Sequence, residues 1–315
     1  MTLAAVGVLA FLVFETLTRR CVASRMQSET GMKVLAVWRS RSAGWWTMAL
    51  VFGVAMLTRG IGSILFFALL SLLLLRELIT ATPTKIEDHR ILCWSFFVVL
   101  PMHYVMLALN WYGLFIILIP VYAFLLVPTV VAVSGNLDDF LGRVARIQWS
   151  LMLAVYCVSH APAILLLRMA GGRLPNAPAL LFLVLVVQAR ESAAAFVNAW
   201  PRTHPTLRLD TGWRMSWEGE AAGYAVALAA AWIVRPLTPF SVMQALALAM
   251  AVSAMCGAAA LCLAGLRSDW GRHASAVIER HGSVVERALA LCFAAPLFFH
   301  LVRYINGGMS RVGFH

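Results

Sequence analysis

The sequence predicts an all-α, polytopic integral membrane protein with about ten transmembrane helices. Its 315 residues are 62% hydrophobic and only 12% charged, and a soluble domain of this length could not bury so much apolar surface. Apolar windows recur along the chain, and most approach the length of about 17–25 residues that crosses a bilayer. The basic residues are also distributed unevenly among the loops, which is typical of a membrane protein with a defined orientation.

Each apolar window predicts one transmembrane helix. They lie near residues 2–18, 44–58, 61–75, 93–109, 111–134, 148–167, 177–189, 220–234, 239–266 and 288–304. The first window has no basic residues before it and the pair Arg19-Arg20 after it, which favours an uncleaved first helix over a signal peptide. The window at 177–189 is short, so the predicted helix count has a margin of one or two.

These windows divide the chain into three predicted regions. Residues 1–43 hold the first transmembrane helix and a basic cytoplasmic loop, and residues 44–175 form an N-terminal transmembrane bundle. Residues 176–315 form a C-terminal transmembrane region that contains two sizeable polar loops, 190–219 and 267–287. We expect a site on one membrane face to be built from those two loops.

The charge distribution predicts the orientation. The net charge is +11, and 19 of the 25 Lys and Arg residues fall in alternate loops, namely 19–43, 76–92, 135–147, 190–219 and 267–287. By the positive-inside rule these loops face the cytoplasm, and both termini then lie on the outer side. The excess of basic residues is therefore explained by topology and by attraction to anionic lipid, and nucleic acid is not an expected partner.

Five segments carry a recognisable mixture of polar and apolar residues. They are RELITATPT at 76–84, NWYGLFIILIPVYAFL at 110–125, IQW at 147–149, SHAPA at 159–163 and the ending at 293–304. They resemble the bacterial phosphatidate cytidylyltransferases, or CDP-diacylglycerol synthases, over nearly the whole chain from about residue 45. The resemblance implies helices and cytoplasmic loops around a polar cavity in the inner membrane, and a reaction of phosphatidate with CTP that gives CDP-diacylglycerol and pyrophosphate.

That reaction brings two polyanions together, so cations must neutralise the phosphate charge. Mg²⁺, the cofactor of an active enzyme, prefers carboxylate oxygens and water. The family's first polar patch reads Q-x-S-D-x-x-Q-Y-x-x-G-K, and this chain has Gln188, then Glu191 in place of the aspartate. Ala194-Ala195 replaces the Gln-Tyr pair and Asn198 replaces the glycine.

The second patch of the family reads S-P-x-K-T-W-E-G. This chain retains Trp217-Glu218-Gly219, but Met215 occupies the position of the phosphate-binding lysine. Arg214 is the neighbouring cation, although arginine and lysine are not interchangeable at a phosphate site. Glu218 is a candidate catalytic residue, and the alternative is that it only stabilises the start of a helix.

The third patch of the family reads S-x-x-K-R-x4-K-D-x-G-x2-L-x-G-H-G-G-x-x-D-R-x-D. Aligned without gaps, this chain keeps Arg267, His281-Gly282 and Arg287, and it has Glu286 for an aspartate. Arg272-His273 replaces Lys-Asp, and Leu289 replaces the last acid. An alignment with a four-residue insertion retains Asp269 instead, and neither alignment recovers an acid at position 289.

The resemblance assigns roles to these positions in this chain. The candidate catalytic residues are Glu191, Glu218, His281 and Glu286; the candidate phosphate-binding residues are Gln188, Arg214, Arg267, Arg272, Gly282 and Arg287; the candidate metal ligands are Glu191, Asp269 and Glu286. The alternatives are that the acids are solvated loop residues and that His281 is a loop residue kept by ancestry.

Two hypotheses follow. We favour a family member that has lost most or all catalytic activity and binds a phospholipid head group or a protein partner, because losing an electrostatic stabiliser costs about 10²–10³ in rate. The other is an active CTP:phosphatidate cytidylyltransferase of phospholipid biosynthesis. The small residues at 221–265 permit close helix packing, so a second copy of the chain or another membrane protein is a further candidate partner.

Overall fold

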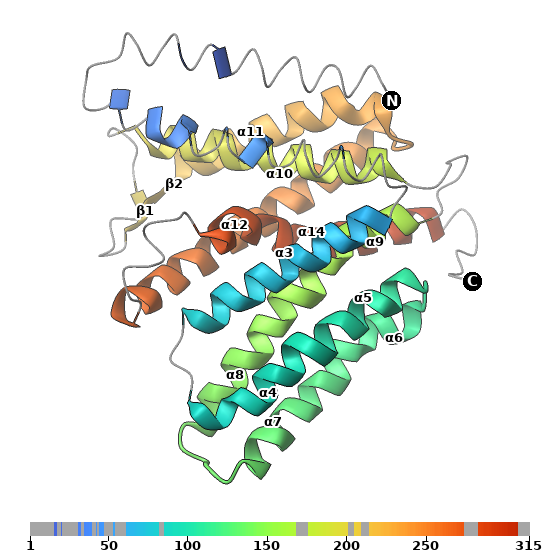
Figure 1. Ribbon diagram of the computed structural model, residues 1–315. Coiled ribbons are helices and arrows are strands. Elements are labelled where there is room, and N and C mark those ends of the chain that lie inside the picture. The colour runs from blue at the N-terminus through green and yellow to red at the C-terminus, as the bar shows by residue number, and fades with distance from the viewer. Residues whose placement is uncertain are drawn as a thin grey trace.

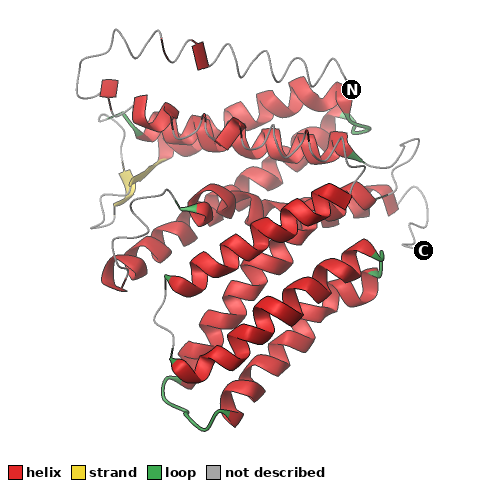
Figure 2. Cartoon of the chain, viewed as in Figure 1, coloured by secondary structure: helices red, strands yellow, loops and turns green. Residues whose placement is uncertain are grey.

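The structure is a computed structural model of the chain. It describes residues 16–17, 20, 31–32, 35–39, 42, 44–46, 53, 61–81, 85–167, 176–200, 205–208, 214–273 and 283–307. Nearly all of the described residues are helical and the only strands among them are two short ones (Figures 1 and 2). The predicted all-α, polytopic membrane fold is therefore confirmed.

The N-terminal half of the described chain forms four long helical rods. The rods are α3 (Ile61–Thr80); η1 (Ile86–Asp88), α4 (His89–Trp94), η2 (Ser95–Val99) and α5 (Leu100–Ala108); α6 (Tyr112–Ile117), η3 (Leu118–Ala123) and α7 (Phe124–Val133); and α8 (Phe140–Leu151), η4 (Met152–Cys157) and α9 (Val158–Leu166). Three of these rods change helical type along their length.

The π-helical turns η2, η3 and η4 lie next to prolines. Pro101 follows η2, Pro120 lies inside η3, and Pro162 follows η4. A proline removes a backbone N–H and crowds the carbonyl four residues earlier. A wider turn accommodates that clash without breaking the rod, so the rods remain long enough to cross a bilayer.

The C-terminal half contributes the remaining elements. They are α10 (Ala177–Asn198), β1 (Pro205–Arg208), β2 (Arg214–Ser216), α11 (Trp217–Val234), η5 (Arg235–Leu237), α12 (Val242–His273) and α14 (Val284–Gly307). The antiparallel hairpin β1–β2 pairs Leu207 with Met215. It leads directly into α11, whose first turn is capped by the Ser216 hydroxyl.

Seven helices of the described chain are long and apolar enough to cross a membrane. They correspond to seven of the ten predicted windows. The window at 220–234 corresponds to α11, which is not among the seven. Nearly all of windows 2–18 and 44–58 lie outside the described residues, so the predicted count of ten stays a prediction.

Two predicted polar loops are partly helical. The loop expected at 190–219 begins only after Asn198, because α10 continues nine residues beyond the apolar window at 177–189. Helix α12 extends into the loop expected at 267–287 as far as His273, and α14 begins within that loop at Val284. Helices can extend past an apolar window where their polar residues find partners within the fold, and the site residues below do so.

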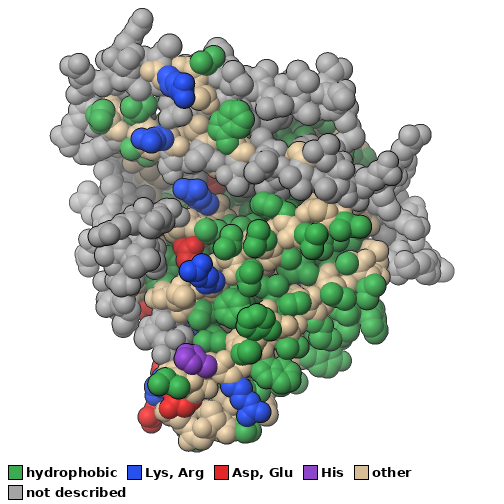
Figure 3. All heavy atoms as spheres, viewed as in Figure 1, with side chains coloured by type: hydrophobic (Ala, Val, Ile, Leu, Met, Phe, Trp, Pro, Cys, Tyr) green, Lys and Arg blue, Asp and Glu red, His purple; other side chains and the backbone are tan. Residues whose placement is uncertain are grey.

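The helices pack around a core that joins both halves of the chain. Helix α10 runs along α11, α12 packs on α14 and α11, and α14 and α3 both pack on α9 (Figure 1). Figure 3 shows hydrophobic side chains spread over one broad face of the molecule. Leu65 and Leu69 of α3 are among the exposed large hydrophobic residues. Such a face suits the hydrocarbon of a bilayer.

Candidate functional site

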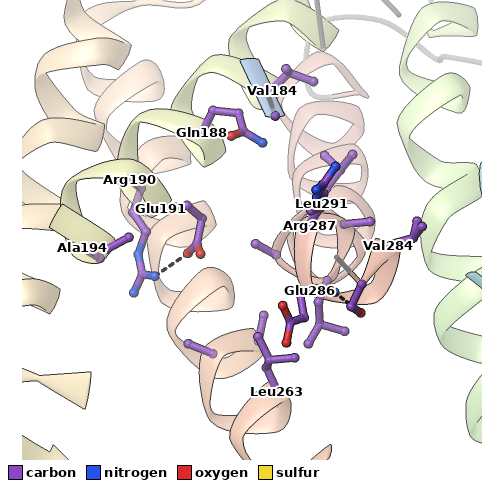
Figure 4. Close-up of a pocket in the computed structure, with 18 of the residues that line it drawn as sticks. Val184, Gln188, Arg190, Glu191, Ala194, Leu263, Val284, Glu286, Arg287 and Leu291 are labelled. Atoms are coloured by element: carbon purple, nitrogen blue, oxygen red, sulfur yellow. Dashed lines mark hydrogen bonds and ion pairs between the residues drawn. The ribbon is translucent and has the colours of Figure 1, made fainter. Parts of the chain in front are cut away.

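A cavity of about 640 Å³ lies among α3, α10, α11, α12 and α14. Its polar lining residues come from four of these helices: Gln188, Arg190, Glu191 and Asn198 from α10, Glu220 from α11, Arg267 from α12, and Glu286 and Arg287 from α14, with Ser283 just before α14. In Figure 4, Glu191 and Glu286 reach the cavity from opposite sides. The volume is in the usual range for small-molecule sites, about 300–1,000 Å³.

The opposite part of the lining is apolar. Phe66, Leu69, Leu70 and Leu73 of α3 contribute to it, and Leu69 and Leu73 are also exposed. The cavity therefore extends from a charged region to the apolar surface of the molecule. A ligand that fits both parts has a polar head and hydrocarbon chains.

Arg190 is the central cation of the polar part. It is 1% exposed, its Nη1 donates to Glu191 Oε1 at 2.6 Å, and its Nη2 donates to Glu220 Oε2. One guanidinium therefore pairs with carboxylates from two helices. A buried charge needs such partners, because an unpaired ion in a low-dielectric interior is very costly.

Two glycines provide the space that this side chain occupies. A Cβ atom added at Gly223 of α11 would lie 3.3 Å from Arg190 Nε, and one added at Gly257 of α12 would lie 3.4 Å from Arg190 Nη2. The first distance is shorter than ordinary van der Waals contact, and the second is at its lower limit. The absence of side chains at these two positions therefore lets α10, α11 and α12 close around the guanidinium.

The start of α14 forms a second polar cluster. Arg267 of α12 donates to Glu286 Oε1 from Nε at 2.8 Å and lies 2.7 Å from it through Nη2. Glu286 N donates to the Ser283 hydroxyl, which in turn donates to Glu77 of α3. Glu77 also accepts from Val284 N at 2.8 Å. The carboxylate of Glu77 thus satisfies the orphan N–H group of Val284 at the start of α14. Its negative charge also lies at the positive end of the helix dipole, which is a stabilising position.

Arg287 differs from the other two arginines of the cavity. Its side chain is exposed and lines the cavity, and within the part of the chain that the structure describes it has neither a hydrogen bond nor an ion pair. Its charge is therefore available to an anion in the cavity.

Asn198 links the end of α10 to the start of α11. Its Oδ1 accepts from Ser216 N at 3.1 Å and from the Ser216 hydroxyl at 2.6 Å. The Ser216 hydroxyl in turn accepts from Gly219 N at 3.0 Å, which caps the helix. Glu218 and Glu220 lie in the first turn of α11, as expected of acids near a positive helix end.

The structure brings five of the predicted site residues to one cavity. Gln188, Glu191, Arg267, Glu286 and Arg287 line it, and so do Met215 and Leu289, where the family's lysine and last acid are replaced. Glu218 and Asp269 are not among its lining residues. His281 and Gly282, and the side chains of Arg214 and Arg272, lie outside what the structure describes.

Sequence reasoning missed four residues of the site, namely Arg190, Glu220, Glu77 and Ser283. Arg190 carried a signal, because an arginine followed by Glu191 and a run of alanines is compatible with a helix that continues past its apolar window. The pairing of Glu77 with Ser283 carried none, since the two residues are 206 positions apart.

The arrangement does not fit a site for Mg²⁺. The described residues contain no group of three or more His, Cys, Asp and Glu side chains that could hold a metal ion. Glu191 and Glu286 instead face arginines at 2.6 and 2.7 Å. The assignment of Glu191, Asp269 and Glu286 as metal ligands stays a prediction from the resemblance.

Comparisons with known proteins identify the family of the chain. A model of the cytidylyltransferase family matches residues 39–305, which is most of the chain. The chain is also 28% identical over 303 residues to the uncharacterized protein YnbB of Escherichia coli (strain K12), covering 94% of this chain and 96% of that protein. The match over residues 39–305 shows that the chain belongs to the cytidylyltransferase family.

Proposed function

We propose that this protein binds the phosphate head group of a phosphatidate-like phospholipid in the cavity and has lost most or all cytidylyl transfer. The observation that supports it best is the pairing of the cavity carboxylates. Glu191, Glu220 and Glu286 each face an arginine at ion-pair distance. Carboxylates held in this way are poor ligands for the Mg²⁺ that the family's chemistry needs.

Binding of a lipid is supported by the two parts of the cavity. The charged part offers Arg287 to a phosphate, and the apolar part runs along α3 to exposed Leu69 and Leu73. A diacyl lipid can then place its phosphate inside while its chains stay in hydrocarbon. The acyl chains supply affinity through burial, at about 25 cal/mol per Å² of apolar surface.

Loss of transfer is supported by two substitutions that line the cavity. Met215 stands where the family has a lysine and Leu289 where it has an acid, and both face the site. CTP and phosphatidate are both polyanions, and their reaction needs cations at the developing charge. Losing one such stabiliser typically costs about 10²–10³ in rate.

The alternative is an active CTP:phosphatidate cytidylyltransferase. The observation in its favour is convergence, because residues of all three family patches line one cavity, among them Gln188, Met215 and Glu286. An active enzyme would have to release Glu191 from Arg190 to hold Mg²⁺.

The deciding experiment uses purified full-length protein with phosphatidate, radiolabelled CTP and Mg²⁺. We expect no CDP-diacylglycerol, together with phosphatidate binding that exceeds phosphatidylcholine binding in native mass spectrometry. Product formation that disappears in Glu191→Gln and Glu286→Gln, but persists in the exposed control Glu87→Gln, would instead establish the active enzyme. Equal binding of the two lipids would contradict the head-group proposal.

A further inference from the structure

We infer that Arg190 replaces a divalent cation in this cavity, so that the protein binds a lipid phosphate monoester without Mg²⁺. The inference rests on the proposed function. It adds that an arginine, and not a metal ion, offsets the negative charge of the carboxylates at the site. It starts from the misfit between the predicted metal ligands and their surroundings, since the carboxylates beside the cavity are already paired with arginines.

The first step is the position of the guanidinium. Arg190 lies between Glu191 of α10 and Glu220 of α11 and contacts both, so it occupies the space between two carboxylates that a bridging cation would need. Figure 4 shows its ion pair with Glu191 at the wall of the cavity. A cation placed beside these oxygens would meet the positive charge of the arginine at short range.

The second step is that the guanidinium cannot move aside easily. Its side chain is 1% exposed, and a Cβ atom added at Gly223 or Gly257 would lie only 3.3 or 3.4 Å from its guanidinium nitrogens. Arg190 is therefore a fixed part of the fold rather than a surface residue that a metal ion displaces.

The third step is the charge of the whole cavity. Among the described residues, its lining includes three arginines (Arg190, Arg267, Arg287) and three glutamates (Glu191, Glu220, Glu286), so the formal charges of these six side chains cancel without a metal. An anionic head group then meets a described lining of zero net charge, in which Arg287 has no acidic partner. Without Arg190 the same cavity has one net negative charge, which opposes a phosphate.

The substitution Arg190→Gln tests this directly. It leaves Glu191 and Glu220 without their shared cation, so the phosphate should be repelled unless a divalent cation enters. We expect the unsubstituted protein to bind phosphatidate in mixed micelles equally in EDTA and in Mg²⁺. Arg190→Gln should lose roughly tenfold to a hundredfold in EDTA and recover most of that loss in Mg²⁺ or Mn²⁺.

Electron paramagnetic resonance of Mn²⁺ gives a second readout that is independent of lipid. We expect bound Mn²⁺ in Arg190→Gln and none at Glu191 in the unsubstituted protein. Two matched controls are Arg190→Lys, which keeps a cation and should show no metal rescue, and Arg146→Gln, which removes a half-exposed arginine that pairs with Asp139 and does not line the cavity, and which should behave as the unsubstituted protein.

The possible failures are distinguishable. Phosphatidate binding by the unsubstituted protein that requires Mg²⁺, or Mn²⁺ binding to it that Glu191→Gln abolishes, would overturn the inference and leave the proposed function standing. Equal binding of phosphatidate and phosphatidylcholine under every condition would overturn the proposed function itself. The measurements on the unsubstituted protein decide the question even where Arg190→Gln does not fold.

Discussion

At the scale of single residues, we expect Arg287 to contribute to ligand binding and not to the stability of the fold. It lines the cavity and has no partner among the described residues, whereas Arg190 and Arg267 are paired. We predict that Arg287→Gln lowers phosphatidate affinity roughly tenfold or more, because a hydrogen bond to a charged group is lost. The melting temperature should stay unchanged. Native mass spectrometry and thermal unfolding check the two statements, and a large fall in stability would show that Arg287 has a structural role.

Glu77, in contrast, is expected to contribute to the stability of the fold. It accepts hydrogen bonds from Ser283 and Val284 and so caps α14 from a different helix. We predict that Glu77→Ala lowers the free energy of unfolding by about 0.5–2 kcal/mol, the usual value of a helix cap. Glu77→Gln, which keeps an acceptor oxygen, should lose less. Denaturant unfolding in detergent measures both, and equal losses would count against the cap.

The site residues were predictable only in part. The resemblance led to Gln188, Glu191, Arg267, Glu286 and Arg287, all of which line the cavity. It did not lead to Arg190 or Glu220, because the family pattern has a serine at position 190 and ends before position 220. Their pairing depends on two helices meeting, and no spacing along the chain encodes that contact.

At the scale of elements, the packing of α12 on α10 depends on Gly257. A Cβ atom there would lie 3.3 Å from Glu220 Oε2, whereas one at Gly265 of the same helix meets nothing within 4 Å. We predict that Gly257→Ala costs about 1 kcal/mol or more by overpacking and weakens phosphatidate binding. Gly265→Ala is the matched control and should be neutral or stabilising, because alanine favours a helix over glycine. Thermal unfolding and lipid binding of both variants test this.

A buried ion pair joins the helix that starts at Ile86 to α8. Arg143 lies 2.6 Å from Asp88 Oδ1 through Nη2, and the two side chains are 1% and 4% exposed. We predict that Asp88→Ala costs about 3 kcal/mol, the lower part of the usual range for a broken buried pair, since Arg143 keeps its bond to the Asn136 carbonyl.

The double variant Asp88→Ala with Arg143→Met is the control for that prediction. Removing both charges leaves no unpaired ion, so part of the lost stability should return. Unfolding in detergent gives the free energy of unfolding of the two single variants and of the double variant. A loss in the double variant equal to the sum of the two single losses would show that the two charges do not depend on each other.

Element boundaries were predictable where the apolar pattern alone decides them. The window at 111–134 matches the rod at 112–133 closely, and the window at 93–109 ends within one residue of the rod at 86–108, which begins seven residues earlier. Helix α10 runs to Asn198 instead of ending near 189, because Arg190 and Glu191 form ion pairs inside the fold. Hydropathy counts such residues as polar and cannot record that their charges are compensated.

At the scale of the whole molecule, the orientation in the membrane is the main untested prediction. The turn at Asn110 joins two spans on the predicted outer side, and Asn136 lies in a loop predicted to face the cytoplasm. We predict that a thiol reagent that does not cross the membrane labels Asn110→Cys in intact bacterial cells and labels Asn136→Cys only after permeabilisation. The unsubstituted protein gives the background from native cysteines, and the reverse pattern would invert the topology.

The sequence by itself determined that this chain is a helical membrane protein and which family it resembles. Both follow from local properties, since the length and apolarity of a window and the residues of a motif need no knowledge of packing. The tertiary structure decided which charges meet. Arg190 pairs with Glu220 thirty positions away, and Glu77 caps a helix more than 200 positions away. These contacts decide the electrostatics of the cavity, because Glu191 and Glu220 have the buried guanidinium of Arg190 between them.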